Sequence, residues 1–181
     1  MRCTLFLLFI GRINWKKGLE RLIAALATIP DCRLVIAGND EEGYQPKLEA
    51  IAARAGVRMR ISFVGPVYGE EKAALLRRAL MLVLPSYSEN FGNVVLEAMA
   101  EGCPVVVTPE VGAADVVIES GAGIVLEGDP AKLGVGIRDL IADKGALVLM
   151  GGKGREFVRQ HYTWEAIANK MEVAYQQVVK A

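Results

Sequence analysis

Short apolar segments alternate with amphipathic segments along the whole chain, and this alternation limits the possible fold more than any other feature. The apolar segments have the length of strands and show no polar alternation, which is typical of strands buried on both faces of a sheet. The segments between them have helical spacing, so we expect an α/β fold with a parallel sheet and helices on both faces. Strands are predicted at 4–10, 32–37, 59–64, 80–84, 104–107 and 123–126. Helices are predicted at 16–29, 45–55, 70–79, 92–101, 112–119, 130–143, 146–160 and 164–179.

The length and charge of the chain restrict its class further. With 181 residues, of which 52% are hydrophobic, it is long enough for one domain with a substantial core and too short for two full ones. Lys and Arg together number 21, as do Asp and Glu, so no overall basic field favours nucleic acid or an anionic membrane. No stretch approaches the roughly 18 apolar residues that a membrane span needs.

The cysteine and histidine content argues against a disulfide framework and against a zinc site. Cys3, Cys32 and Cys103 are far apart and odd in number, which is typical of reduced core residues and favours a cytoplasmic protein. The single histidine, His161, falls at a predicted helix C-terminus, where we expect a structural role. We expect no zinc site, because no Cys pair accompanies that histidine.

The segment 80–107, LMLVLPSYSENFGNVVLEAMAEGCPVVV, contains two predicted strands that enclose a polar loop and a helix. Such a loop lies at the carboxyl end of a strand, where open α/β sheets bind their ligands. The amides of Gly92, Asn93 and Val94 begin the helix without intrahelical partners, so they could hold a phosphate. Gly92 lacks a Cβ, so a ligand could approach the backbone closely.

Two carboxylates, Glu89 and Glu97, flank this anion site. Because they would repel a phosphate, they are better suited to accept hydrogen bonds from hydroxyls on either side of it, such as those of a ribose and a sugar. The spacing alone fits another interpretation equally well, with Glu89 a solvated loop residue and Glu97 part of an exposed stripe with Glu101.

A second candidate site follows the first strand, in IGRINWKKGLERLIAAL. Asn14 is expected to cap the helix, and Arg12, Lys16 and Lys17 gather at its amino end, where cations oppose the helix dipole by up to about 1 kcal/mol each. An anion among them would reverse that cost, because Arg12 can bond two phosphate oxygens and Lys17 adds a point charge. These residues alone could also be solvated cations at the start of an exposed helix. The buried face of the helix is expected to consist of Leu19, Leu22, Ile23 and Leu26.

The run SENFGNVVLEAMAEGCPVV closely resembles the signature of the retaining glycosyltransferases of the GT-B family typified by sucrose, glycogen and lipopolysaccharide-type synthases (family 4). In that family the first Glu of the motif contacts donor-sugar hydroxyls, the Phe-Gly amides contact sugar and diphosphate, and the second Glu holds the ribose diol. The resemblance assigns these binding roles to Glu89, Phe91, Gly92, Asn93, Val94 and Glu97. Gly-Arg-x4-Lys-Gly resembles a second element of the family, which implies that Arg12 and Lys17 bind the diphosphate and, with Glu89, act in catalysis.

Other segments resemble the family less specifically. FVGPVYG stands where the family holds the nucleotide base through backbone atoms, which implies roles for Val64, Gly65 and Val67, although a strand end with a Pro turn explains them equally well. AGNDEEG departs from the family's Gly-x-Gly segment at Asn39 and Asp40, so only proximity to the ligand is implied.

Two further departures and one helix complete the comparison. Asp115 stands where a Glu is more usual, and the preceding segment lacks the usual Gly-Gly pair, which weakens any role for this loop in donor contact. Asp129 and Pro130 are expected to cap and begin a helix. In the family the last helix, here 164–179, crosses to the other half of the enzyme, so we expect part of its apolar face to be exposed.

The resemblance covers nearly the whole chain and only the second half of a GT-B enzyme. It implies that 1–181 form a Rossmann-like, nucleotide-sugar-binding domain and that an N-terminal acceptor domain is absent. Any peripheral membrane association would occur through that missing domain. The implied donor is a UDP- or GDP-linked hexose-type sugar, with no cofactor, no metal and little activity in the isolated domain. Half of a GT-B sugar-nucleotide epimerase or hydrolase, or a non-catalytic nucleotide-sugar-binding module, are the alternatives.

Overall fold

The computed structural model describes residues 5–179 and contains one six-stranded sheet in which all neighbouring strands are parallel. The strand order is β3-β2-β1-β4-β5-β6. The strands are β1 (Phe6–Ile10), β2 (Arg33–Ala37), β3 (Ile61–Gly65), β4 (Met81–Leu84), β5 (Val105–Val107) and β6 (Gly123–Val125). The predicted parallel α/β sheet is therefore confirmed, while Thr4, the predicted start of the first strand, lies outside the described residues.

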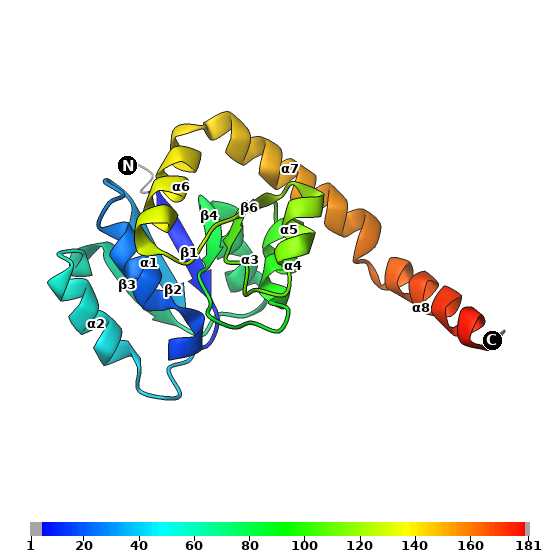
Figure 1. Ribbon diagram of the computed structural model, residues 1–181, viewed down its shortest axis with the longest axis horizontal. Helices are drawn as coiled ribbons and strands as arrows, with labels where there is room; N and C mark the ends of the chain where they lie inside the picture. Colours follow the sequence, from blue (N-terminus) through cyan, green and yellow to red (C-terminus); the bar gives the residue numbers. More distant parts are fainter. Residues whose placement is uncertain (1–4, 180–181) are drawn as a thin grey trace.

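The helices pack in two groups, visible in Figure 1. Helix α1 packs against α2 and α6, whereas α4 packs against α3 and α7, and α5 also packs against α7. The helices are α1 (Leu19–Leu26), α2 (Gln45–Arg54), α3 (Gly69–Arg78), α4 (Asn93–Ala100), α5 (Ala114–Ser120), α6 (Pro130–Ala142), α7 (Lys144–His161) and α8 (Trp164–Val179). Two short 3-10 turns, η1 (Trp15–Lys17) and η2 (Arg58–Arg60), precede α1 and β3.

The core lies between the sheet and these helices. Every residue of β4 and β5 is buried, as their uninterrupted apolar sequences predict. The predicted buried face of α1 is confirmed, and burying such a side chain is worth about 1.5–3 kcal/mol relative to leaving it in water. The buried face of α1 consists of four fully buried residues, Leu19, Leu22, Ile23 and Leu26.

The predicted continuous helix 16–29 is wrong at its start. The chain forms η1, turns at Gly18 in the left-handed region (φ 61°) and only then begins α1. Asn14 makes no side-chain capping bond, and its Oδ1 is buried without a partner among the described residues. A Cβ on Gly18 would lie 2.1 Å from the carbonyl oxygen of Pro85, so the turn reflects close contact with the loop after β4. Hydrophobic periodicity could not reveal that contact.

The ends of the later helices agree with the sequence. Asp129 accepts hydrogen bonds from the amides of Ala131 and Lys132 at 3.0 Å each, so its predicted capping role is confirmed. His161 ends α7, with its ring 4.6 Å from that of Phe157. None of the helices within residues 5–179 is both long and apolar enough to cross a membrane.

Helix α8 extends away from the rest of the domain (Figure 1). Its apolar residues are largely in solvent, with Trp164 90% and Tyr175 62% exposed. Met171 and Val173 are about half exposed as well. The expected exposure of part of this apolar face is confirmed.

Candidate functional site

The candidate site lies at the carboxyl ends of β1 and β4, which are neighbours in the middle of the sheet. The strand order reverses there, because the chain runs outward from β1 to β3 on one side and from β4 to β6 on the other. The loops after the two strands are joined directly, since the amide of Tyr87 donates to the carbonyl of Lys16 at 2.8 Å. A sheet of this kind has its natural ligand crevice at such a reversal.

The amino end of α4 presents unpaired backbone donors at this point. Among residues 5–179, the amides of Gly92, Asn93 and Val94 donate no backbone hydrogen bond, and the first bond of the turn runs from Val95 to Gly92 at 2.8 Å. Helix α4 begins at Asn93, one residue later than predicted, and Gly92 precedes it in the left-handed region (φ 87°). These donors and the positive end of the helix dipole can hold an anion.

The prediction that Gly92 clears space for a ligand by lacking a Cβ is wrong. A Cβ at this position would meet Cγ of Glu89 at 3.3 Å and Cγ1 of Val111 at 3.4 Å, so it would point into the protein. Glycine is needed for the left-handed backbone and not to clear space for a ligand.

The segment 108–113 holds the loop that carries Glu89, a role that the sequence did not reveal. The amide of Glu89 donates to Glu110 at 3.1 Å, Gly112 donates to Glu89 at 2.9 Å, and Ala113 donates to Phe91 at 2.9 Å. A Cβ on Gly112 would lie only 1.9 Å from the carbonyl oxygen of Asn90, so the contact requires glycine. In the sequence, Gly112 was the one available sign of this contact.

Lys17 and Glu89 form a partly buried ion pair across 72 positions of sequence. Their side chains are only 14% and 21% exposed, which rules out the interpretation of Glu89 as a fully solvated loop residue. The turn at Gly18 places Lys17 here, and the 108–113 segment places Glu89. The structure thus brings together two of the residues predicted to be catalytic.

Glu97 forms a second ion pair, with a residue that the sequence analysis missed. Nζ of Lys72, in the first part of α3, lies 2.8 Å from Oε1 of Glu97 in α4. Glu101, one turn further along α4, pairs instead with Arg77 at 3.0 Å. Each of the two carboxylates of the motif is therefore paired with a lysine from a different element.

A cavity of about 240 Å³ opens beside these pairs, at the carboxyl ends of β1, β2 and β3. Arg12 is exposed at its wall, and the ion pairs of the described residues do not include it. The cavity is lined by Ile10, Gly11, Arg12, Ala37, Gly38, Asn39, Pro66, Val67, Tyr68 and Lys72.

The three residues predicted to contact a base through their backbone atoms do not all line the cavity. Val67 lines the cavity, whereas the carbonyl of Gly65, which is not a lining residue, accepts a hydrogen bond from the amide of Gly38 at 2.8 Å. Val64 instead lines a different hollow, together with Phe6 and Val35.

The loop after β2 contributes to the cavity and to the fold. Asn39 lines the cavity, as the expected proximity requires. Asp40 holds the start of α2, because its carboxylate accepts hydrogen bonds from the amides of Tyr44 at 2.6 Å and Gln45 at 3.0 Å. A Cβ on Gly38 would lie 1.7 Å from the carbonyl oxygen of Gly11, so the two loops touch through their backbones.

Other chemical groups of the domain lie outside this arrangement. Burial raises the pKa of the Cys103 thiol to about 12 and also raises that of Cys32, so neither is a thiolate nucleophile at neutral pH. Within residues 5–179, no three His, Cys, Asp or Glu side chains gather in a way that could hold a metal ion.

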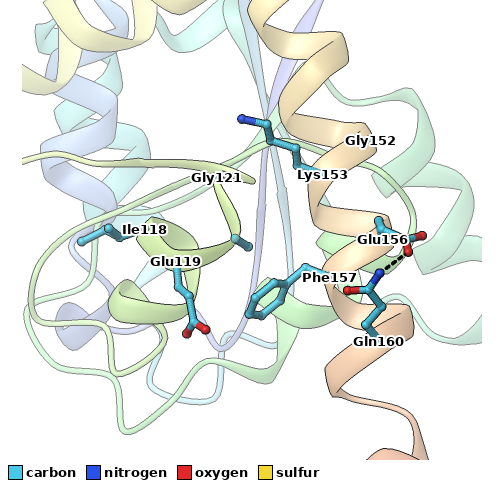
Figure 2. A pocket seen from close by; sticks show the side chains of 9 residues that line it. Ile118, Glu119, Gly121, Gly152, Lys153, Glu156, Phe157 and Gln160 are labelled. Atoms are coloured by element: carbon cyan, nitrogen blue, oxygen red, sulfur yellow. Dashed lines mark hydrogen bonds between the residues drawn. The ribbon is translucent and has the colours of Figure 1, made fainter.

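A larger hollow of about 640 Å³ lies between α5 and α7 (Figure 2). Ile118 and Glu119 of α5 and Lys153 and Phe157 of α7 line it, with Phe157 pointing toward α5, and none of the predicted site residues lines it. Its Glu156 already accepts a hydrogen bond from Gln160. The hollow therefore lacks the convergence of unpaired donors and cations found at the β1–β4 reversal.

Comparison with known proteins agrees with this geometry. The family model described as "Glycosyl transferases group 1" matches residues 4–172. An uncharacterized glycosyltransferase of Methanocaldococcus jannaschii is 34% identical over 173 residues, which cover 93% of this chain and 44% of the relative. The chain thus spans less than half the length of that curated relative.

Solved structures show the same fold. A sucrose-phosphate synthase from Thermosynechococcus elongatus is 33% identical with a TM-score of 0.87, covering 98% of this chain and 46% of that one. An Anabaena protein crystallised with UDP-glucose has a TM-score of 0.84 at 22% identity, covering 97% of this chain and 49% of that one, and shares the fold. On the family match and this shared GT-B architecture, the chain belongs to the group 1 glycosyltransferases.

Proposed function

We propose that this domain binds the nucleoside diphosphate sugar of a retaining, metal-independent glycosyltransferase that transfers a hexose-type sugar. The observation that supports this most directly is the meeting of Lys17 and Glu89 beside the unpaired amides of α4. A cation and helix amides suit a diphosphate, whereas a carboxylate next to them suits the hydroxyls of the attached sugar.

The proposed roles follow the positions of the groups. Arg12 and Lys17 bind the diphosphate together with the amides of Gly92, Asn93 and Val94. As the glycosidic bond stretches, negative charge grows on the leaving diphosphate, and these fixed donors stabilise it.

The two carboxylates hold the rest of the donor. Glu89 binds sugar hydroxyls, so that the anomeric carbon faces the acceptor, and Glu97 binds the ribose diol. Phe91 lies beside the sugar, and the base occupies the cavity at Val67. Because Lys17 is paired with Glu89 in the free domain, the diphosphate would share or take over that cation on binding.

The acceptor would be held by a second domain, so the 181-residue chain alone is expected to bind the donor and transfer little sugar. We propose a cytoplasmic location, where sugar nucleotides are available. A uridine donor is supported by the Anabaena protein bound to UDP-glucose, which has this fold.

Calorimetric titration of UDP, GDP and ADP into the domain tests the proposal. One nucleotide should bind in the micromolar to low-millimolar range, and Glu97→Gln should weaken it by roughly 1–3 kcal/mol, the cost of losing a charged hydrogen bond. Glu127→Gln is the matched control, because Glu127 also pairs with a lysine, at 2.6 Å, but lies outside the site.

Two outcomes would count against the proposal. If Glu97→Gln and Glu127→Gln changed nucleotide affinity equally, the proposed role of Glu97 would be refuted. In a separate incubation of the domain with a nucleotide sugar, release of free sugar or formation of a C2-epimer would instead favour a hydrolase or epimerase.

A further inference from the structure

Lys72 is a cation of this site that the proposed roles leave unused. Its Nζ lies 2.8 Å from Oε1 of Glu97, and its side chain also lines the cavity that holds Arg12 and Val67. It lines a second hollow of about 230 Å³ together with Glu97. Lys72 therefore stands between the cavity and Glu97.

The contact between α3 and α4 does not depend on the ion pair of Lys72 and Glu97. Arg77 already links the two helices, since it pairs with Glu101 of α4 at 3.0 Å and with Glu70 of its own helix. A lysine near the amino end of α3 also interacts unfavourably with the helix dipole. The acidic Glu70 and Glu71 of the first turn, by contrast, interact favourably with it. Stability of α3 alone thus gives no reason for a cation here.

The pair has a clear consequence for Glu97. A carboxylate offers about four lone-pair positions on two oxygens. Lys72 occupies Oε1, so Oε2 and the remaining positions on Oε1 stay available to hydroxyl donors. Lys72 also fixes the carboxylate before any ligand arrives, and a side chain ordered in advance loses less entropy on binding.

We propose that Lys72 is a positioning residue that holds the Glu97 carboxylate for the ribose diol and thereby sets the preference of the site for ribonucleotides over 2′-deoxyribonucleotides. This inference rests on the proposed function and adds a residue of α3 to the donor site. The Glu97 side chain is already 42% exposed, and without Lys72 it would turn into solvent.

The test compares binding of UDP with binding of 2′-deoxy-UDP, and likewise the guanine and adenine pairs, by calorimetry. The wild-type domain should prefer the ribonucleotide, and Glu97→Gln should lose most of that preference. Lys72→Met should reduce the preference by roughly three- to tenfold, as expected for a partly exposed charged hydrogen bond. Lys72→Arg should restore most of it, since a guanidinium can also hold a carboxylate.

Lys132→Met provides the matched control, because Lys132 pairs with Glu127 at 2.6 Å away from the site. It should leave the ratio of the two affinities unchanged. That ratio separates positioning from stability, because a change in folding alone lowers binding of both nucleotides equally.

The outcomes are distinct for the two hypotheses. If Glu97→Gln abolishes the ribose preference and Lys72→Met leaves it intact, the role of Lys72 is refuted and the proposed function stands. If the wild-type domain binds none of the nucleotides, both are overturned.

Discussion

The contact between Gly18 and Pro85 makes a sharp prediction, because this turn brings Lys17 to Glu89. A residue other than glycine in the left-handed region costs about 1–2 kcal/mol. At Gly18 (φ 61°) the new Cβ would also lie 2.1 Å from a backbone oxygen, and forcing such an overlap apart costs typically about 1–3 kcal/mol more. Gly18→Ala should therefore lower the free energy of unfolding by about 2–5 kcal/mol.

Gly43 supplies the matched control for this substitution. Its φ of 63° is almost the same, and nothing lies within 4 Å of a Cβ built there, so Gly43→Ala should lose only the backbone cost of about 1–2 kcal/mol. Urea denaturation followed by circular dichroism measures both, and the excess of about 1–3 kcal/mol for Gly18→Ala should move the midpoint by about a further 0.5–1.5 M at a constant slope of about 2 kcal/mol/M. Gly18→Ala should also weaken nucleotide binding, because Lys17 moves with the turn.

Equal destabilisation by the two substitutions would refute the reasoning. It would mean that the loops after β1 and β4 can separate without cost, so the close contact would not be what places Lys17. Loss of stability without loss of nucleotide binding would refute the second step alone.

Two further predictions concern the rest of the domain. Asp129→Ala removes both capping bonds of α6 and should lower the free energy of unfolding by about 1 kcal/mol in urea melts, whereas the same change at Asp139, an exposed residue in the last turn of α6, removes no cap and should not lower it. Because burial raises the pKa of Cys103 from 9.0 to about 12, the unfolded thiol ionises first as the pH rises. Stability relative to Cys103→Ala should thus be full below pH 9 and fall as the pH approaches 12; a difference that stays constant across this range would contradict the assignment.

The sequence was a good guide to the fold because its signals were local. Uninterrupted apolar segments such as 80–84 and 104–107 can be satisfied only as strands buried on both faces, and these became β4 and β5. The ends of helices were predictable where one side chain decides them, as Asp129 does for α6. Helix periodicity likewise identified the buried face of α1 without reference to the rest of the chain.

The structure brings the two predicted loops together and adds residues that the sequence did not indicate. Gly-Arg-x4-Lys-Gly and the motif from Glu89 to Glu97 identified the two loops that meet. Lys72 was missed because nothing in the local sequence distinguishes a lysine at the start of an exposed helix from one that pairs with α4. The segment 108–113 was missed because it acts through backbone hydrogen bonds, which do not depend on the identity of the side chains.

The sequence by itself determined the parallel α/β class, the order of its elements and the loop that begins α4, because each depends on patterns within a few residues. Only the tertiary structure decided that the expected helix 16–29 breaks at Gly18, that Lys17 meets Glu89 and that Lys72 meets Glu97. The physical reason is that these features arise where loops from distant parts of the chain touch through backbone atoms and paired charges, and such contacts leave no periodic trace in a sequence.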